Sequence, residues 1–237
     1  MKRTAIITGG SRGIGRGIAE ELADMGYDLL LVAKDSARLK KAAYQISANK
    51  KVNVDYFVCD IANAKKVDAL YDFCVSKRII PDLLVNNAGI FIQGTTGNAP
   101  LEKYDSIMAV NTRGMFHLTQ KLLPLIKKGH DQRVIIISST WALESSSPEG
   151  REDSTIYSIS KWALRGWARH LRTELRKYNI GVTIIYPGAV FTDEWKGTRT
   201  PRSKFIEPSD IGKVVRAVVS TNSKSVIEEV IIRPIGG

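Results

Sequence analysis

Short apolar runs alternate with longer amphipathic stretches along nearly the whole chain. The apolar runs are typical of β-strands buried on both faces, and they cover residues 3–8, 28–33, 53–59, 82–86, 133–138, 181–186 and 225–233. The stretches between them have helical periodicity and cover residues 13–25, 36–48, 64–77, 104–127, 155–178 and 209–221.

Strands and helices that alternate in this way predict right-handed βαβ units. We therefore expect a doubly wound α/β fold, in which a mostly parallel sheet of seven strands lies between helices on both faces, in three layers. No Pro/Gly/Ser-rich linker, internal repeat or low-complexity tract interrupts the pattern. One domain is expected over residues 1–237, and 43% hydrophobic with 25% charged residues suits a globular core.

Composition and charge argue against several other classes of protein. No apolar run approaches the roughly 18 residues that cross a bilayer, so we expect no membrane span, and Gly9-Gly10 ends the first run too early for a signal peptide. Two cysteines, Cys59 and Cys74, are too few for a disulfide framework, which favours a cytoplasmic location. The net charge of +11 is spread along the helical stretches without interleaved aromatic residues, so no nucleic-acid partner is expected. The three histidines lack the spacing of metal ligands, so no metal site is predicted.

A glycine-rich segment joins the first strand to the first helix, with the sequence Thr8-Gly9-Gly10-Ser11-Arg12-Gly13-Ile14-Gly15. Glycines at these positions allow a tight turn and a close approach of a pyrophosphate, while the helix N-terminus offers free N–H groups. Because the segment stands between a strand and a helix, it predicts a dinucleotide site; the alternative is a structural turn.

The end of the second strand bears on which nicotinamide cofactor is bound. Lys34 is the first residue past this strand, and Arg12 can reach toward the same place. Cations there suit the 2′-phosphate of NADP(H), which we favour, whereas a carboxylate suits the free 2′-hydroxyl of NAD(H). Asp35 keeps NAD(H) as an alternative, and Arg12 and Lys34 could be ordinary surface cations.

Tyr157 and Lys161 lie four residues apart in a predicted helix and so share one face. A neighbouring ammonium lowers the pKa of a phenol toward neutrality, which would let Tyr157 transfer protons. Taken alone, such a pair is more often a solvated helix pair.

Further motifs stand in a fixed order along the chain. After the glycine-rich segment come Asp60, then Asn86-Asn87-Ala88-Gly89, Asn111, Ser139, Tyr157-x-x-x-Lys161, and Pro187-Gly188 with Thr192. With these motifs the sequence resembles the short-chain dehydrogenase/reductase family, of single-domain Rossmann type, over essentially its whole length.

The resemblance implies a role for each catalytic residue. Tyr157 would exchange a proton with the substrate oxygen while hydride moves between substrate and nicotinamide. Lys161 would lower the pKa of Tyr157 and bind the nicotinamide ribose. Ser139 would hydrogen-bond the reacting oxygen, and Asn111 would hold a water of the proton relay.

The motifs and the resemblance together predict a cofactor site. Asp60 would bind the adenine edge, although it could simply cap the next helix, and Thr192 with Pro187-Gly188 would fix the carboxamide. Asn86 is interpreted as a residue that ties the strand rather than a ligand contact. The predicted cofactor-binding residues are Gly9, Ser11, Arg12, Gly13, Ile14, Gly15, Lys34, Asp60, Ile61, Asn87, Ala88, Gly89, Tyr157, Lys161, Pro187, Gly188, Val190 and Thr192.

The chain departs from the family pattern around the serine. Ser139 precedes Tyr157 by 18 residues instead of about a dozen, which indicates a polar loop inserted within residues 143–152. Ser145 fits the usual spacing better, but Ser139 directly follows the strand 133–138; we prefer Ser139, with Ser138 and Ser145 as lesser candidates.

Two irregular segments, 141–154 and 190–207, each follow a strand and are expected to form pocket walls. The second carries Lys196, Arg199, Arg202 and Lys204, and we hypothesise that this cationic flap closes over the phosphates or an anionic substrate. Trp141 and Trp195 on these segments are consistent with an apolar or aromatic carbonyl substrate.

The function expected from these features is an NADP(H)-dependent oxidoreductase that interconverts a small-molecule carbonyl and a secondary alcohol. Alternatives are a catalytically silent dinucleotide-binding sensor or scaffold, and an epimerase or dehydratase with the same Tyr and Lys, although those relatives resemble longer chains. The resemblance also implies a homodimer or homotetramer that packs through the helices 104–127 and 155–178.

Overall fold

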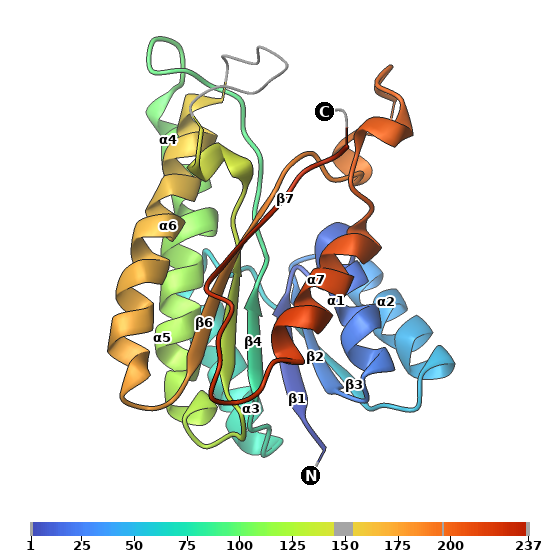
Figure 1. The fold of residues 1–237 in the computed structure, drawn as a ribbon. Helices are drawn as coiled ribbons and strands as arrows, with labels where there is room; N and C mark the ends of the chain where they lie inside the picture. Colours follow the sequence, from blue (N-terminus) through green and yellow to red (C-terminus); the bar gives the residue numbers. More distant parts are fainter. Residues whose placement is uncertain (1, 145–153, 196, 236–237) are drawn as a thin grey trace.

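Seven strands pair into one parallel sheet in the computed structural model, which describes residues 2–144, 154–195 and 197–235. Their spatial order is β3-β2-β1-β4-β5-β6-β7, and every pairing is parallel (Figure 1). The strands are β1 (Thr4–Thr8), β2 (Asp28–Ala33), β3 (Val54–Val58), β4 (Leu83–Asn86), β5 (Arg133–Ile137), β6 (Gly181–Pro187) and β7 (Glu229–Ile232). This arrangement confirms the predicted doubly wound fold.

Helices cover both faces of the sheet. One face carries α1 (Gly13–Asp24), α2 (Ser36–Asn49) and α7 (Pro208–Val219). The other carries α3 (Ala64–Ser76), α5 (Met115–Ile126) and α6 (Thr155–Arg176), with α4 (Leu101–Met108) beside α6. Of the described helices, none is long and apolar enough to cross a bilayer.

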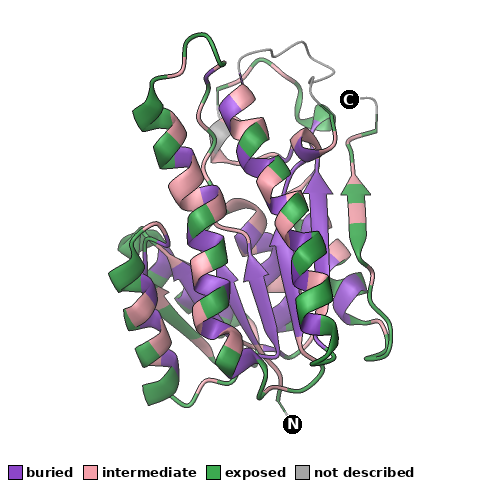
Figure 2. Ribbon diagram, turned by 90° about the vertical axis from the view of Figure 1, so that its left-hand side faces the viewer, coloured by how far each residue is buried: buried purple, intermediate pink, exposed green. Residues whose placement is uncertain are grey.

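The core has two halves, one on each side of the sheet, because successive strand residues point to opposite faces. Ile7 and Leu31 pack toward α1 and α2, while their neighbours Ile6 and Leu30 pack toward α3 and α5. Figure 2 shows the buried residues gathered in the central strands and the exposed ones on the outer sides of the helices. The three-layer prediction is confirmed.

The outer strands depart from the expectation of burial on both faces. β3 and β7 contain only half-buried and exposed residues because each has a neighbour on one side only. β7 is also shorter than the predicted 225–233: Ser225 donates its N–H to the Asn222 carbonyl in a turn, and pairing with β6 begins at Glu229.

A second departure concerns the predicted helix 104–127, which is not continuous. A six-residue π-helical segment, Ala109–Gly114, separates α4 from α5. A Cβ at Gly114 would lie 2.8 Å from the carbonyl oxygen of Ile61, and Asn111 turns its amide toward Ile90. The wider turn therefore accommodates contacts with two neighbouring loops, as π-helical segments at functional sites often do.

The chain order of the sheet defines a crevice. From β1 the chain winds outward through β2 and β3, then crosses back to β4 on the other side of β1. In open α/β sheets, ligands bind beyond the carboxyl ends of the strands at this switch point. The loops after β1 and β4 therefore meet where a ligand is expected.

Candidate active site

The glycine-rich loop after β1 has a backbone that side chains would disrupt. Gly9 and Gly13 have φ values of +67° and +52°, a region that L-residues rarely adopt. A Cβ at Gly15 would lie 2.3 Å from the carbonyl oxygen of Gly9 and 2.6 Å from Nδ2 of Asn87. The loop therefore needs glycine here for conformation and for close packing.

Thr8, which the sequence analysis did not select, ties this loop to the end of β4. Its buried hydroxyl accepts hydrogen bonds from the N–H groups of Asn87 (2.9 Å) and Ala88 (3.0 Å) and donates to the carbonyl of Val85. The side chain of Asn87 donates back to the Thr8 carbonyl at 2.8 Å. These bonds hold the two loops of the crevice in a fixed relation.

The N-terminus of α1 faces the crevice and suits an anion. The helix begins at Gly13, its capping residue Arg12 is extended, and its first turn carries no acidic residue. The first N–H groups of a helix lack partners within the helix and carry a partial positive charge. A phosphate group would satisfy them.

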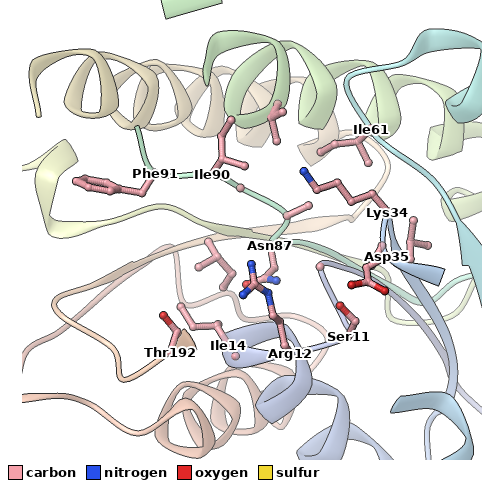
Figure 3. A pocket seen from close by; sticks show the side chains of 18 of the residues that line it. Ser11, Arg12, Ile14, Lys34, Asp35, Ile61, Asn87, Ile90, Phe91 and Thr192 are labelled. Atoms are coloured by element: carbon pink, nitrogen blue, oxygen red, sulfur yellow. The ribbon is translucent and has the colours of Figure 1, made fainter. Parts of the chain in front are cut away.

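A cavity of about 320 Å³ lies over the glycine loop and the strand ends (Figure 3). It extends from the end of β2, where Lys34 and Asp35 reach in, to Tyr157 at the start of α6. The predicted site residues that line it are Gly9, Ser11, Arg12, Gly13, Ile14, Lys34, Asp60, Ile61, Asn87, Ala88, Gly89, Tyr157, Lys161 and Thr192.

The remaining predicted residues do not line the cavity: Gly15, Asn111, Ser139, Pro187, Gly188 and Val190. The Val190 side chain is buried in the core, where its backbone pairs with Ile206. The N–H of Gly188 donates to the carbonyl of Ile232 on β7. Any contact of Val190 or Gly188 with a cofactor would therefore have to come from other backbone atoms.

Several further residues, not predicted from the sequence, line the cavity. Most are apolar neighbours of predicted ones, but Arg38 and Asp193 are charged. Arg38 could have been found from its place in the first turn of the helix after the second strand. Asp193 carries no such signal beyond its position next to Thr192. The full set is Val32, Ala33, Arg38, Cys59, Ile90, Phe91, Val110, Ile137 and Asp193.

Charged side chains gather at the β2 end of the cavity. The carboxylate of Asp35 caps α2 by accepting from the N–H of Arg38 at 3.0 Å, and its other oxygen lies 3.3 Å from Nε of Arg38. Lys34 is exposed beside it. Three cations and two carboxylates line this end of the cavity, so it keeps a small net positive charge.

Asp60 shapes the turn after β3 rather than capping α3. Its Oδ1 accepts from the N–H of Ala62 at 3.0 Å, whereas α3 is capped by Asn63, whose side chain accepts from the N–H of Lys66. The alternative role of Asp60 as the helix cap is therefore wrong, and its carboxylate faces the cavity.

Tyr157 and Lys161 occupy the first turns of α6 and face the cavity together. Nζ of Lys161 lies 5.5 Å from the centre of the Tyr157 ring and donates to the carbonyl of Ile137 at 3.3 Å. The Lys161 side chain is only 5% exposed, so its charge acts in a medium that screens it weakly. This arrangement puts a buried cation next to a phenol at one end of the cavity.

The two serines after β5 differ in how they use their hydroxyl groups. Ser138 lines the cavity, but its hydroxyl donates to the carbonyl of Lys161 at 3.3 Å. Ser139 is 7% exposed, and its Oγ accepts from the N–H of Trp141, which leaves its own hydroxyl proton for another acceptor. Ser145 lies outside the described residues.

Asn111 is buried and joins three segments. Its amide accepts from the N–H of Ile90 (2.8 Å) and donates to the carbonyl of Ile90 (2.9 Å) and to Oγ of Ser160 (3.0 Å). Asn86, at the end of β4, donates a side-chain hydrogen bond to the hydroxyl of Thr119 on α5, which ties the strand to that helix. Asn111 thus fixes the loop after β4 against α6.

Aromatic side chains surround Tyr157. Phe91, 37% exposed, contacts its ring at a centroid distance of 5.0 Å, and Trp141 lies edge-on at 6.4 Å. Trp195 instead packs on Phe205 at 4.8 Å and does not line the cavity. Trp141 does not line the cavity either, although it lies against the Tyr157 ring, so neither tryptophan forms the pocket wall that was expected.

None of the described cations of the predicted flap, Arg199, Arg202 and Lys204, lines the cavity, which gives no support to the flap hypothesis. Nε of Arg202 lies 2.7 Å from the carboxylate of Glu207. Lys196 lies outside the described residues. In the part of the chain that the structure describes, no group of three or more His, Cys, Asp or Glu side chains could hold a metal ion.

Comparison with known proteins places this site in context. Residues 3–203 match a family described as short chain dehydrogenase. The whole chain is 33% identical to a protein named sepiapterin reductase from Chlorobaculum tepidum, of which the match covers 98%.

Solved structures share the fold. An alcohol dehydrogenase from Thermococcus sibiricus, complexed with 5-hydroxy-NADP, is 27% identical with a TM-score of 0.88, over 99% of this chain and 97% of that one. L-sorbose reductase from Gluconobacter frateurii, complexed with NADPH and L-sorbose, is 27% identical with a TM-score of 0.88, over 98% and 95% of the two chains. Because the family match spans most of the sequence and the relative aligns from end to end, the chain belongs to the short-chain dehydrogenase/reductase family.

Proposed function

We propose that this protein is an NADP(H)-dependent oxidoreductase that interconverts a carbonyl compound and a secondary alcohol. The observation that carries the proposal is a single cavity that holds a glycine loop at one side, cations at one end and the Tyr157–Lys161 pair at the other. A sensor or scaffold would need the first two features but not a phenol beside a buried ammonium.

The residues present fit a phosphorylated dinucleotide. The glycine loop and the N-terminus of α1 would hold the pyrophosphate, because the loop keeps this shape only with glycine at positions 9 and 15, where a Cβ would collide with Asn87 or the Gly9 carbonyl. Arg12, Lys34 and Arg38 would hold the 2′-phosphate, because guanidinium and ammonium groups both bind phosphate oxygens. Structural neighbours complexed with NADP or NADPH support this choice over NAD(H).

The chain's own side chains would manage the proton. When bound, the nicotinamide supplies or accepts the hydride. Tyr157 would give its phenolic proton to the carbonyl oxygen, and the cation of Lys161 would stabilise the phenolate that remains. The free hydroxyl proton of Ser139 would bond the same oxygen. Asn111 would keep the Ile90 loop in place and hold the relay water, as the resemblance implies.

The substrate is proposed to carry a planar ring. Phe91 and Trp141 flank the phenol that would donate the proton, and aromatic walls favour stacked or edge-on contact with a ring. The relative named sepiapterin reductase is consistent with a ring-bearing substrate. Within an apolar wall of this kind, charged substrates would be disfavoured.

The test combines binding with turnover. We expect NADPH fluorescence to report binding, and NADPH oxidation to report turnover of an aryl ketone in a panel of carbonyl compounds. Tyr157→Phe should lower kcat by about 10²–10⁴ because a general acid is lost, while the Kd for NADPH stays near that of the wild type. Tyr44→Phe, at an exposed tyrosine on α2, serves as the matched control.

The outcomes separate the proposed enzyme from the sensor or scaffold. Retained turnover in Tyr157→Phe would remove Tyr157 as the acid. Binding of NADPH without turnover across the panel would favour the sensor. The homodimer or homotetramer stays a prediction, which light scattering of the purified protein would check.

A further inference from the structure

One carboxylate bridges two arginines across the cavity. Asp193, which opens the short 3₁₀ helix Asp193–Trp195 after β6, places Oδ2 3.2 Å from Nη1 of Arg12 and 3.5 Å from Nη1 of Arg38. Arg12 belongs to the glycine loop and Arg38 to the first turn of α2. All three side chains line the same cavity.

The loop after β6 lies close enough to the glycine loop to bring Asp193 to Arg12. A Cβ at Gly13 would lie 3.2 Å from Cγ2 of Thr192, so the segment after β6 packs directly on the glycine loop. Asp193 is the next residue, and its reach to Arg12 therefore follows from where the loop lies. The contact joins residues 181 positions apart in sequence.

This carboxylate contacts the same kind of donor that a phosphate would use. Guanidinium groups bind carboxylate and phosphate oxygens with the same planar donor geometry. Arg12 and Arg38 are two of the three cations assigned above to the 2′-phosphate. Asp193 engages Nη1 of both, and Asp35 lies 3.3 Å from Nε of Arg38. A 2′-phosphate would compete with Asp193 for the Nη1 groups, whereas an uncharged 2′-hydroxyl would not displace it.

We propose that Asp193 is a specificity-determining residue, a carboxylate that competes with the cofactor 2′-phosphate for Arg12 and Arg38. The inference rests on the proposed function and adds that the preference for NADP(H) over NAD(H) is held below what the arginines alone would give. The Arg12 and Arg38 side chains are 51% and 55% exposed, and Asp193 is 32% exposed, so the ion pairs are weak enough for a dianionic phosphate to displace.

The direct test is Asp193→Asn, which removes the charge and keeps the size. Two exposed ion pairs correspond to about a 2- to 30-fold change in an equilibrium constant. The Kd for NADPH, measured by fluorescence titration, should fall by about that factor, while the Kd for NADH stays near the wild-type value. Asp193→Glu retains the carboxylate and should largely restore the wild-type ratio of the two constants.

A matched control separates the bridge from a general change in charge. Asp24→Asn removes one carboxylate at the far end of α1, where Asp24 pairs with Lys50, and should alter neither Kd. Calorimetric titration with adenosine 2′,5′-bisphosphate and with ADP confines the comparison to the adenosine end of the site. The first ligand should bind more tightly to Asp193→Asn, and the second should bind unchanged.

Three results would overturn the proposal. Equal tightening of NADPH and NADH would indicate general electrostatic repulsion from Asp193, and an unchanged Kd for NADPH would show that the bridge does not compete. Weaker NADPH binding would mean that Asp193 helps to hold the cofactor. If the wild-type protein bound neither cofactor, the proposed function would fail first, and this inference with it.

Discussion

The two adjacent serines that follow β5 differ in the hydrogen bonds that their hydroxyl groups make. Ser138 and Ser139 both follow β5, and Ser138 is the one that lines the cavity. Its hydroxyl is, however, committed to the carbonyl of Lys161, while Ser139 accepts from Trp141 and retains a proton to donate. Under the proposed function, donor capacity therefore favours Ser139 as the group that would bond a developing oxyanion, whereas the cavity lining favours Ser138.

Substitution of each serine tests this argument. Ser139→Ala should lower kcat by about 10²–10³, the usual effect of losing one oxyanion donor, with little change in the Kd for NADPH. Ser138→Ala removes a bond to a backbone carbonyl and should affect stability more than kcat. Steady-state kinetics with NADPH and an aryl ketone, together with urea unfolding, gives both quantities. The opposite pattern, with the larger loss of kcat in Ser138→Ala, would transfer the role to Ser138.

Spacing along one element is enough to predict which of its residues lie together. Tyr157 and Lys161 meet because one helix carries both, four residues apart, and they line one cavity. The Asp193 bridge escapes such reasoning, because it depends on where a loop after β6 lies relative to the glycine loop. Contact between residues this far apart in sequence is set by tertiary packing, which a periodic pattern does not encode.

At the scale of elements, buried strands were predicted most closely. β2 has the predicted bounds, and β1, β4 and β5 differ from theirs by one residue at one end, because a run of apolar residues between polar turns is unambiguous. The break between α4 and α5 was not predicted, because Asn111 and Gly114 fit a helical pattern equally well. Their contacts with Ile90 and Ile61 require the wider turn.

The glycine loop and α6 offer a matched pair of glycine substitutions. Gly15→Ala would press a Cβ against the Gly9 carbonyl, and overpacking of this kind costs about 1–3 kcal/mol. Gly166 lies on the exposed side of α6 with open space around it, so Gly166→Ala should raise the free energy of unfolding by about 0.5–1 kcal/mol. Urea unfolding and NADPH titration measure both variants. Wild-type NADPH affinity in Gly15→Ala would contradict the close packing described here.

At the scale of the whole molecule, the basic charge is partly neutralised by ion pairs between elements. On α6, Arg169 and Arg172 pair with Glu229, and Arg172 also pairs with Glu228, beside the edge strand β7. The basic side of this helix therefore finds acidic partners within the chain. The net charge of +11 bears on function mainly at the β2 end of the cavity, where the arginines lie.

Buried ionisable groups that carry no charge predict a loss of stability at alkaline pH. Burial raises the pKa of Cys74 to about 12 from an ordinary 9.0, and it raises those of Cys59 to about 11 and Tyr186 to about 12. Because each pKa is higher in the folded than in the unfolded protein, the stabilisation is complete below about pH 8 and is lost as the pH rises toward 12. The fold itself thus sets an upper limit of pH for this protein.

Cys74 allows this loss to be measured for one group. It is fully buried on α3, so between about pH 8 and pH 10.5 the unfolded thiol ionises while the folded one does not, which lowers the free energy of unfolding by about 2 kcal/mol. Cys74→Ala cannot make this contribution, so the stability difference between wild type and Cys74→Ala, from urea unfolding, should shrink by that amount over the same range. Val67→Ala, a buried variant on the same helix without an ionisable group, should keep a constant difference from wild type. A difference for Cys74→Ala that did not change with pH would mean that the thiol ionises equally readily in the folded protein, which burial in an apolar core opposes.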